Sequence, residues 1–199
     1  MAERVILASA SMARAGLLRA AGVEFTVEPA AIDESRLKRK AREAGDSAIA
    51  CASALATEKA CIVSRRHPEA LVIGADQILA AGDEWFDKPV DLAEAAAQLR
   101  ALRGRVHELA TAACVACGGV PLWSARSAPE MHMRWFSDRF IEAYVAAEGV
   151  ALLGSVGAYR LEDRGAQLFS RIIGDHFAVL GLPLLELLGF LRERGVMLI

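Results

Sequence analysis

The chain has 199 residues, of which 54% are hydrophobic, a composition that suits one domain with a sizeable buried core over residues 1–199. Its formal net charge is −2 at pH 7, whereas a general attraction to nucleic acid or anionic lipid needs a basic surface. No apolar run reaches the ~18 residues of a membrane span, and the N-terminus lacks a signal-peptide layout. We therefore expect a cytoplasmic protein that contacts neither nucleic acid nor membrane.

The four cysteines favour a reduced protein. Cys114 and Cys117 form a single C-x-x-C in an apolar, strand-like run, while Cys51 and Cys61 stand apart. A zinc site would need a second ligand pair at suitable spacing, and the sequence offers none. We expect reduced, buried thiols, with a metal or redox site as the alternative.

Strand and helix patterns alternate along the chain, which predicts an α/β architecture with a mixed sheet. Short apolar or alternating runs predict strands over 5–8, 25–29, 70–76, 107–117, 129–136, 157–161 and 168–173. Helical periodicity and capping residues predict helices over 14–21, 47–65, 90–102, 138–149 and 182–195.

The first strand turns directly into a helix through polar residues. Ser9, Ser11 and Arg14 lie at this turn. Free N–H groups and the dipole at a helix start attract anions, and a guanidinium suits phosphate, so the turn is a candidate phosphate cradle. The alternative is an ordinary turn in which a serine caps the helix and the arginine is solvated.

Three further charged residues stand at informative positions. Asp76 ends an almost entirely apolar strand, where a carboxylate can bind a cation or orient water. Lys88 precedes Pro89, which restricts it to extended backbone geometry and so aims its side chain. Lys59 lies on an Ala-rich helix. The alternatives are a turn carboxylate that bonds its own backbone and two solvated lysines.

Seven segments follow one another along almost the whole chain. They are LASASMARAGLL (7–18), IDE (32–34), LATEKA (55–60), IGADQ (73–77), FDKP (86–89), LRGRVHELATAA (102–113) and the closing block at 157–184. In this order they resemble the Maf family of nucleotide pyrophosphatases, once named for an effect on bacterial septum formation. The resemblance implies a two-lobed mixed β-sheet with flanking helices, similar in outline to inosine triphosphate pyrophosphatases, with the active site in the central cleft.

The resemblance also implies an activity: hydrolysis of a nucleoside triphosphate to its monophosphate and pyrophosphate with Mg²⁺ or Mn²⁺. By position, Asp76 matches the catalytic carboxylate and, with Glu34, a metal-binding pair. The phosphate- and substrate-binding positions fall on Ser9, Arg14, Lys59, Lys88 and Glu162. The sequence is compatible with a homodimer and does not fix the oligomeric state.

The chain departs from the family pattern at positions that carry charge. The family's Pro-Arg-Arg is replaced by Met12, Ala13 and Arg14, and Ser155 replaces a common lysine. Two positive groups are therefore absent. This loss supports a rival function, a catalytically weak nucleotide-binding regulator of cell division.

Two positions bear on the base. Members of the family that take thymidine or uridine triphosphate have Thr after the Asp and Gln in the closing block, whereas this chain has Gln77 and Glu162. Both resemble the branch that acts on 7-methyl-GTP. A carboxylate would accept from the N1–H and N2–H₂ edge of a cationic methylated guanine. The alternatives are a pyrimidine preference, and a surface Glu162 paired with Arg160 or Arg164.

Overall fold

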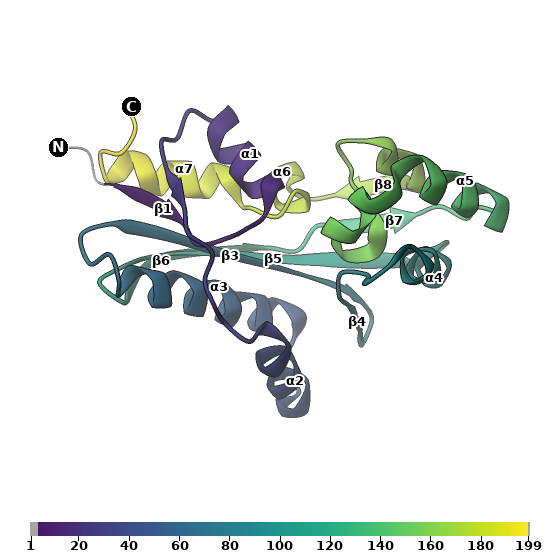
Figure 1. Cartoon of the computed structure of the whole chain (residues 1–199), viewed down its shortest axis with the longest axis horizontal. Helices are drawn as coiled ribbons and strands as arrows, with labels where there is room; N and C mark the ends of the chain where they lie inside the picture. The colour runs from purple at the N-terminus through teal and green to yellow at the C-terminus, as the bar shows by residue number, and fades with distance from the viewer. Residues whose placement is uncertain (1–3, 199) are drawn as a thin grey trace. The chain divides into compact units, whose positions relative to one another are not determined.

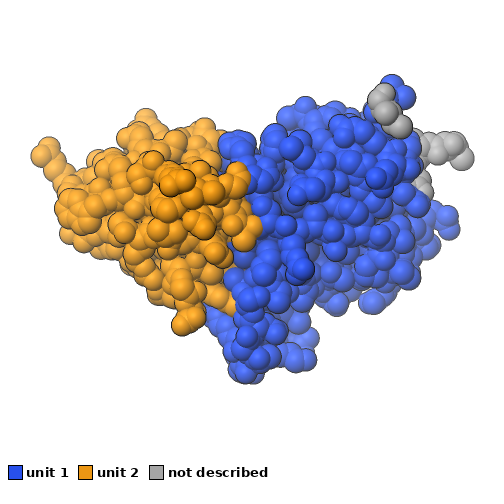
Figure 2. Space-filling model, turned by 180° about the vertical axis from the view of Figure 1, so that it is seen from behind, with its two compact units in different colours: residues 1–77, 110–127, 175–199 blue, residues 78–109, 128–174 orange. Residues whose placement is uncertain are grey.

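The computed structural model describes residues 4–198, which form two compact units. Unit 1 comprises residues 4–77, 110–127 and 175–198, and unit 2 comprises residues 78–109 and 128–174 (Figure 2). The described strands belong to one mixed sheet with the order β2-β1-β3-β5-β7-β8, with β4 paired to β3 and β6 paired to β5. Strands β3 (Leu71–Ala81) and β5 (Val106–Cys117) each contribute residues to both units. The mixed α/β class expected from the sequence is confirmed.

Unit 1 is built on parallel strands. β1 (Val5–Leu7) pairs in parallel with β2 (Thr26–Val27) and with the start of β3, where Val5 is opposite Leu71 and Leu7 is opposite Ile73. The second half of β5 pairs antiparallel with β6 (Val120–Ser127). β1 and the first residues of β3 are buried and apolar, as expected for parallel strands covered on both faces, whereas both residues of β2 are exposed.

Helices cover both faces of the unit 1 strands (Figure 1). Alternate residues of β1 enter different clusters: Val5 and Leu7 pack with residues of α1 and α7, whereas Ile6 packs with Val63 of α3. The helices of this unit are α1 (Met12–Ala20), α2 (Glu34–Ala44), α3 (Ala48–Ser64), α6 (His176–Val179) and α7 (Leu184–Glu193).

Helix α3 lies unusually close to β3 because small residues face each other there. A Cβ added to Gly74 would clash with the carbonyl oxygen of Ala56 and would lie 2.6 Å from the backbone nitrogen of Ala60. Both alanines are buried. The glycine therefore sets the distance between the strand and the helix.

Unit 2 contains the antiparallel strands β4 (Glu84–Phe86), β7 (Glu130–Met133) and β8 (Phe169–Ile173), which pair with β3, β5 and β7 respectively. Its helices are α4 (Leu92–Leu102) and α5 (Asp138–Glu148), followed by short 3₁₀ turns at Gly149–Gly154, Val156–Ala158 and Arg164–Leu168. In its core, His107 Nε2 is 2.7 Å from the hydroxyl of Tyr159.

Capping residues begin the helices as the sequence predicts. Ser47, Asp91 and Ser137 accept hydrogen bonds from backbone N–H groups of the first turns of α3, α4 and α5, and Gly149 ends α5. The Glu94 side chain accepts a hydrogen bond from the backbone N–H of Val90, the residue before the cap Asp91, and so adds a second contact at the start of α4.

Several boundaries differ from the prediction. The strand expected to end at Asp76 continues to Ala81, and the strand expected at 157–161 is absent, since a 3₁₀ turn with Gly157 at φ 76° begins there. Helix α2 and strands β4 and β6 were not predicted.

Two physical properties complete the fold. Cys51, Cys61 and Cys114 are buried free thiols, while Cys117 is half-buried and donates to the carbonyl oxygen of Pro68. Within residues 4–198, no helix combines the length and apolarity needed to cross a membrane.

Candidate active site

The turn between β1 and α1 holds a buried guanidinium. Arg14 Nε donates to the carbonyl oxygen of Gly181 at 2.8 Å, and Nη1 donates to Ser9 Oγ at 3.1 Å and to the carbonyl oxygen of Ala75 at 3.0 Å. Ser11 is the N-cap of α1 and accepts from the backbone N–H of Arg14. The serine cap of the alternative interpretation is therefore present, but its solvated arginine is wrong, because Arg14 is only 9% exposed.

Neutral atoms satisfy this cation. Among the described residues, no carboxylate forms an ion pair with Arg14. Burial lowers the pKa of Arg14, and the negative charges of Asp76 and Glu34 oppose this shift. A guanidinium remains charged at neutral pH even so. The result is a fixed positive charge that an anion can complement.

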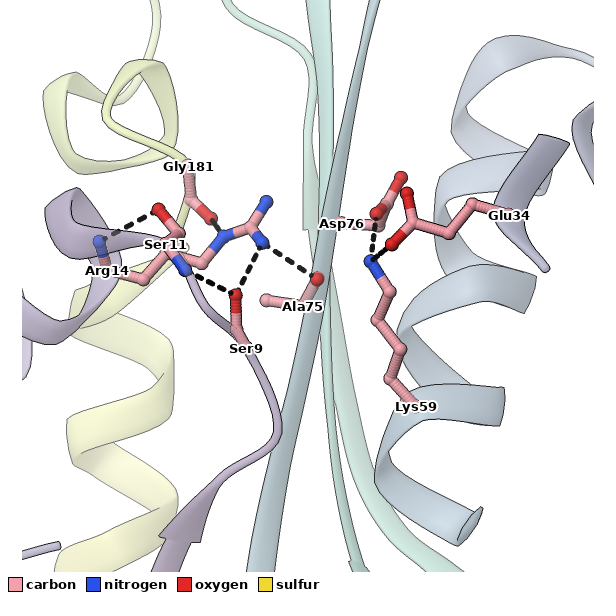
Figure 3. Close-up of polar contacts among 8 residues, drawn as sticks. All are labelled: Ser9, Ser11, Arg14, Glu34, Lys59, Ala75, Asp76 and Gly181. Atoms are coloured by element: carbon pink, nitrogen blue, oxygen red, sulfur yellow. Dashed lines mark hydrogen bonds and ion pairs between the residues drawn. The ribbon is translucent and has the colours of Figure 1, made fainter. Parts of the chain in front are cut away.

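The second part of the site joins two carboxylates through one ammonium. Lys59 Nζ lies 2.6 Å from Asp76 Oδ1 and 2.6 Å from Glu34 Oε1 (Figure 3). Lys59 comes from the middle of α3, and Glu34 is the first residue of α2, directly after the N-cap Asp33. Asp76 is only 4% exposed and its Oδ2 has no hydrogen-bond partner among the described residues.

The electrostatics of Glu34 follow from this arrangement. Burial raises the pKa of the Glu34 carboxyl, but the hydrogen bond and charge of Lys59 outweigh burial and hold the pKa below its usual value. Glu34 is therefore ionised at neutral pH. Two anionic carboxylates are kept together here because the ammonium between them offsets their mutual repulsion.

Both parts of the site meet on consecutive residues of β3. Arg14 binds the backbone oxygen of Ala75, and the next residue is Asp76, which pairs with Lys59. Figure 3 shows Arg14 on one side of the strand and the Lys59–Asp76–Glu34 cluster on the other. The structure thus brings together Ser9, Arg14, Glu34, Lys59 and Asp76, five of the residues expected from the sequence.

The remaining two expected residues, Lys88 and Glu162, belong to unit 2. Glu162 is partly exposed, and its Oε1 lies 3.6 Å from Arg160 Nε. This is the surface ion pair of the alternative interpretation of Glu162. Lys88 precedes Pro89 at the start of the segment leading to α4, where Gln98 of that helix donates to the neighbouring carbonyl oxygen of Asp87.

Gly181 lies outside the predicted set of site residues, whereas Gln77 is a position that the sequence links to the choice of base. Gly181 supplies a carbonyl oxygen to Arg14 and has a φ of 97°, a conformation that favours glycine. The side-chain nitrogen of Gln77 donates to Thr111 Oγ1 at 2.8 Å and to the carbonyl oxygens of Ala178 and Val179 at 2.9 and 3.2 Å. A glycine just before the closing helix was the available signal for Gly181.

Asp76 and Glu34 fit a divalent cation that takes its other ligands from substrate and water. Among residues 4–198 no group of three His, Cys, Asp or Glu side chains could enclose a metal ion. Asp76 Oδ2 is nevertheless a buried carboxylate oxygen without a partner, and Glu34 lies beside it. Mg²⁺ is commonly bound by one or two carboxylates together with substrate phosphates and water. The donor set therefore fits such an ion.

The chain has close relatives of known name. The nucleoside triphosphate pyrophosphatase of Granulibacter bethesdensis is 52% identical over 191 residues, which cover 96% of this chain and 97% of the relative. The 7-methyl-GTP pyrophosphatase of Rhizobium etli is 45% identical over 195 residues, covering 98% of each chain. The nucleoside triphosphate pyrophosphatase of Paramagnetospirillum magneticum is 47% identical over 190 residues, covering 96% of this chain and 98% of its own.

A family model agrees with these similarities. The model described as Maf-like protein matches residues 4–194, a span that contains every residue of the site. Since the match extends over nearly the whole sequence, the chain belongs to the Maf-like protein family.

Proposed function

We propose that this protein hydrolyses a nucleoside triphosphate between its α- and β-phosphates, releasing the nucleoside monophosphate and pyrophosphate. The observation that carries the proposal is that the buried Arg14 guanidinium and the buried Lys59–Asp76 pair contact consecutive residues of β3. The names of the relatives support the same activity.

A fixed positive charge is available to the phosphate chain. Arg14 is held by three neutral acceptors, so its charge is available to a phosphate oxygen without breaking an ion pair. Ser9 orients the guanidinium through its hydroxyl, and the free N–H groups at the start of α1 add to the attraction. Lys59 binds a further phosphate, and Lys88 keeps the phosphate-binding role that its match to the family pattern implies.

Asp76 is the catalytic carboxylate of the proposed reaction. It is buried and pairs with Lys59, and its unpartnered Oδ2 can accept a hydrogen bond from the attacking water. Asp76 and Glu34 would also hold a Mg²⁺ or Mn²⁺ ion. Such an ion supplies charge neutralisation for the phosphates when bound.

The substrate class that we favour is a modified purine nucleotide such as 7-methyl-GTP. A relative that is 45% identical carries that name, and Glu162 offers a carboxylate to a cationic base. Its ion pair with Arg160 is partly exposed and is therefore weak enough to exchange for another partner. A preference for dTTP or UTP is the second candidate.

Pyrophosphate release from a panel of nucleotides tests both statements. The panel holds 7-methyl-GTP, GTP, dTTP and UTP, each with Mg²⁺ or Mn²⁺, and the products are separated to confirm cleavage between the α- and β-phosphates. Release of monophosphate and pyrophosphate is expected, fastest for 7-methyl-GTP. Nucleotide binding without turnover on any member would favour a regulatory binding protein instead.

A further inference from the structure

The position of Lys59 conflicts with metal binding by the same carboxylates. Its ammonium lies 2.6 Å from an oxygen of Asp76 and 2.6 Å from an oxygen of Glu34, and the side chain is only 8% exposed. It therefore stands between the two groups that would hold a divalent cation. An ion that binds both carboxylates must share them with this ammonium or displace it.

The charges around the ligand-free site also matter. The carboxylates of Asp76 and Glu34 lie near the cations of Lys59 and Arg14, and Lys38 adds a further positive charge near Glu34. A divalent ion alone would leave this buried cluster with an excess of positive charge. A free triphosphate alone would leave an excess of negative charge, so each ligand is opposed by the electrostatics unless the other is present.

We propose that Lys59 is a resident counter-cation that competes with the divalent ion for Asp76 and Glu34, so that metal and triphosphate bind together and neither binds well alone. This inference rests on the proposed function for the identity of the anion. It assigns Lys59 a second role besides phosphate binding: it keeps the carboxylates paired until a phosphate arrives.

The ammonium of Lys59 and the two carboxylates can each exchange one partner for another. When phosphate oxygens arrive, Lys59 finds new anionic acceptors and can leave the carboxylates without losing its hydrogen bonds. The carboxylate oxygens it leaves are then available to the ion. Asp76 Oδ2 lacks a partner in the described structure, so this oxygen would be available to an ion without any exchange.

The test measures Mn²⁺ binding to the nucleotide-free full-length protein, following the free Mn²⁺ signal by electron paramagnetic resonance. Lys59→Met keeps the length of the side chain and removes the ammonium. We expect Lys59→Met to bind Mn²⁺ at least about tenfold more tightly than the wild type, because the competing charge is gone. Lys59→Arg, which keeps a cation, should bind Mn²⁺ as weakly as the wild type.

Two controls fix the interpretation. Lys40→Met removes the same charge from an exposed position of α2, and it should leave Mn²⁺ affinity within about twofold of the wild type. Asp76→Asn added to Lys59→Met should abolish the gain, which locates the ion at the carboxylates. Circular dichroism of each variant confirms that the fold persists.

A second readout uses inorganic tripolyphosphate as the anion. For the wild type, Mn²⁺ and tripolyphosphate together should raise the melting temperature by more than the sum of their separate effects. For Lys59→Met, Mn²⁺ alone should already stabilise. The proposal is overturned if Lys59→Met binds Mn²⁺ no better than the wild type, or if the wild type binds Mn²⁺ tightly without an anion. Neither measurement involves turnover. A wild type that hydrolyses no nucleotide would therefore refute the pyrophosphatase activity, while the Mn²⁺ measurements would still decide the role of Lys59.

Discussion

Arg14 donates a hydrogen bond to the carbonyl oxygen of Ala75 at 3.0 Å, although the two residues are separated by 61 positions in the sequence. The contact ties the first turn of α1 to the residue just before Asp76. The proposed phosphate-binding arginine and the proposed catalytic carboxylate are thereby linked through one peptide of β3, and the effects of changing either residue can be measured separately.

Asp76→Asn should abolish most of the turnover and preserve the fold. The amide keeps the shape of the side chain and loses the charge that binds a cation and accepts a proton. We expect kcat to fall by about 10²–10⁴-fold, with an unchanged circular dichroism spectrum. Asp83→Asn, at the exposed turn before β4, should keep full activity. Turnover within threefold of the wild type would remove Asp76 from the mechanism.

Arg14→Lys should weaken substrate binding and the fold together. A lysine keeps the charge but cannot reach Ser9, Ala75 and Gly181 at once as the planar guanidinium does. We expect KM for the triphosphate to rise about tenfold or more, and the free energy of unfolding to fall by about 1–3 kcal/mol as buried carbonyls lose their donors. Arg19→Lys, on the same helix and exposed, should do neither. An unaltered KM would show that the guanidinium does not contact phosphate.

Gly74→Ala should move α3 away from β3. The new methyl group would clash with Ala56 and Ala60, so the helix must shift, and we expect a loss of about 1–3 kcal/mol in the free energy of unfolding. Because α3 carries Lys59, kcat/KM should fall as well. Gly16→Ala is the matched control, since nothing lies within 4 Å of its added Cβ in the exposed face of α1. It should stabilise the protein by about 0.5–1 kcal/mol. If Gly74→Ala and Gly16→Ala changed the free energy of unfolding equally, the close approach of α3 to β3 would not be what makes Gly74 important.

Glu162→Gln tests the choice of base. If the carboxylate accepts hydrogen bonds from a cationic methylated guanine, kcat/KM should be higher for 7-methyl-GTP than for UTP in the wild type. In the variant, the ratio of the two values should fall towards one. Asp163→Asn removes the other carboxylate that pairs with Arg160, and it should leave the ratio unchanged. A wild type that prefers pyrimidines would refute the base assignment and leave the hydrolytic activity standing.

The buried His107 should make stability fall in mild acid. Burial, together with the smaller effect of the Arg105 charge, lowers the pKa of His107 from 6.5 to about 4. Above pH 6.5 both folded and unfolded chains hold a neutral imidazole, so His107 does not lower the free energy of unfolding there. As the pH falls from 6.5 towards 4, only the unfolded chain gains the proton, and up to about 3 kcal/mol is lost. Denaturant titrations across this range should show the loss in the wild type.

His107→Phe should flatten that part of the pH profile, whatever its effect on stability at pH 7. His176→Phe, at the start of α6, removes a histidine from another part of the fold and should retain the wild-type slope. A profile unchanged by His107→Phe would assign the acid sensitivity to other groups.

The sequence predicts five of the residues that the structure brings together beside β3, because motifs fix their order and strand or helix patterns fix their elements. The burial of Arg14 could not be predicted, since it depends on Gly181, which lies 167 positions away. Helix α2 escaped prediction because most of its residues are charged and only Ala41 is buried, so it has no apolar stripe.

Other differences arise from tertiary structure as well. The segment 157–161 has strand-forming residues, but Gly157 and Ala158 adopt positive φ angles of 76° and 57°, which end any strand there. Strand β3 continues past Asp76 because Ile78, Leu79, Ala80 and Ala81 are all buried, which a polar pair at 76 and 77 conceals in the sequence. Local patterns do not specify such long-range packing.

The opposed contacts on residues 75 and 76 of β3 have a consequence for hydrogen exchange. A strand held by a guanidinium on one side and by an ammonium on the other can open only if both contacts break together. The amides of residues 73–77 should therefore exchange only with global unfolding, unlike those of the mobile loops that form many binding sites. The chemical centre of this protein would then coincide with its slowest-exchanging segment, and mild heating should unfold other regions before it loses its geometry.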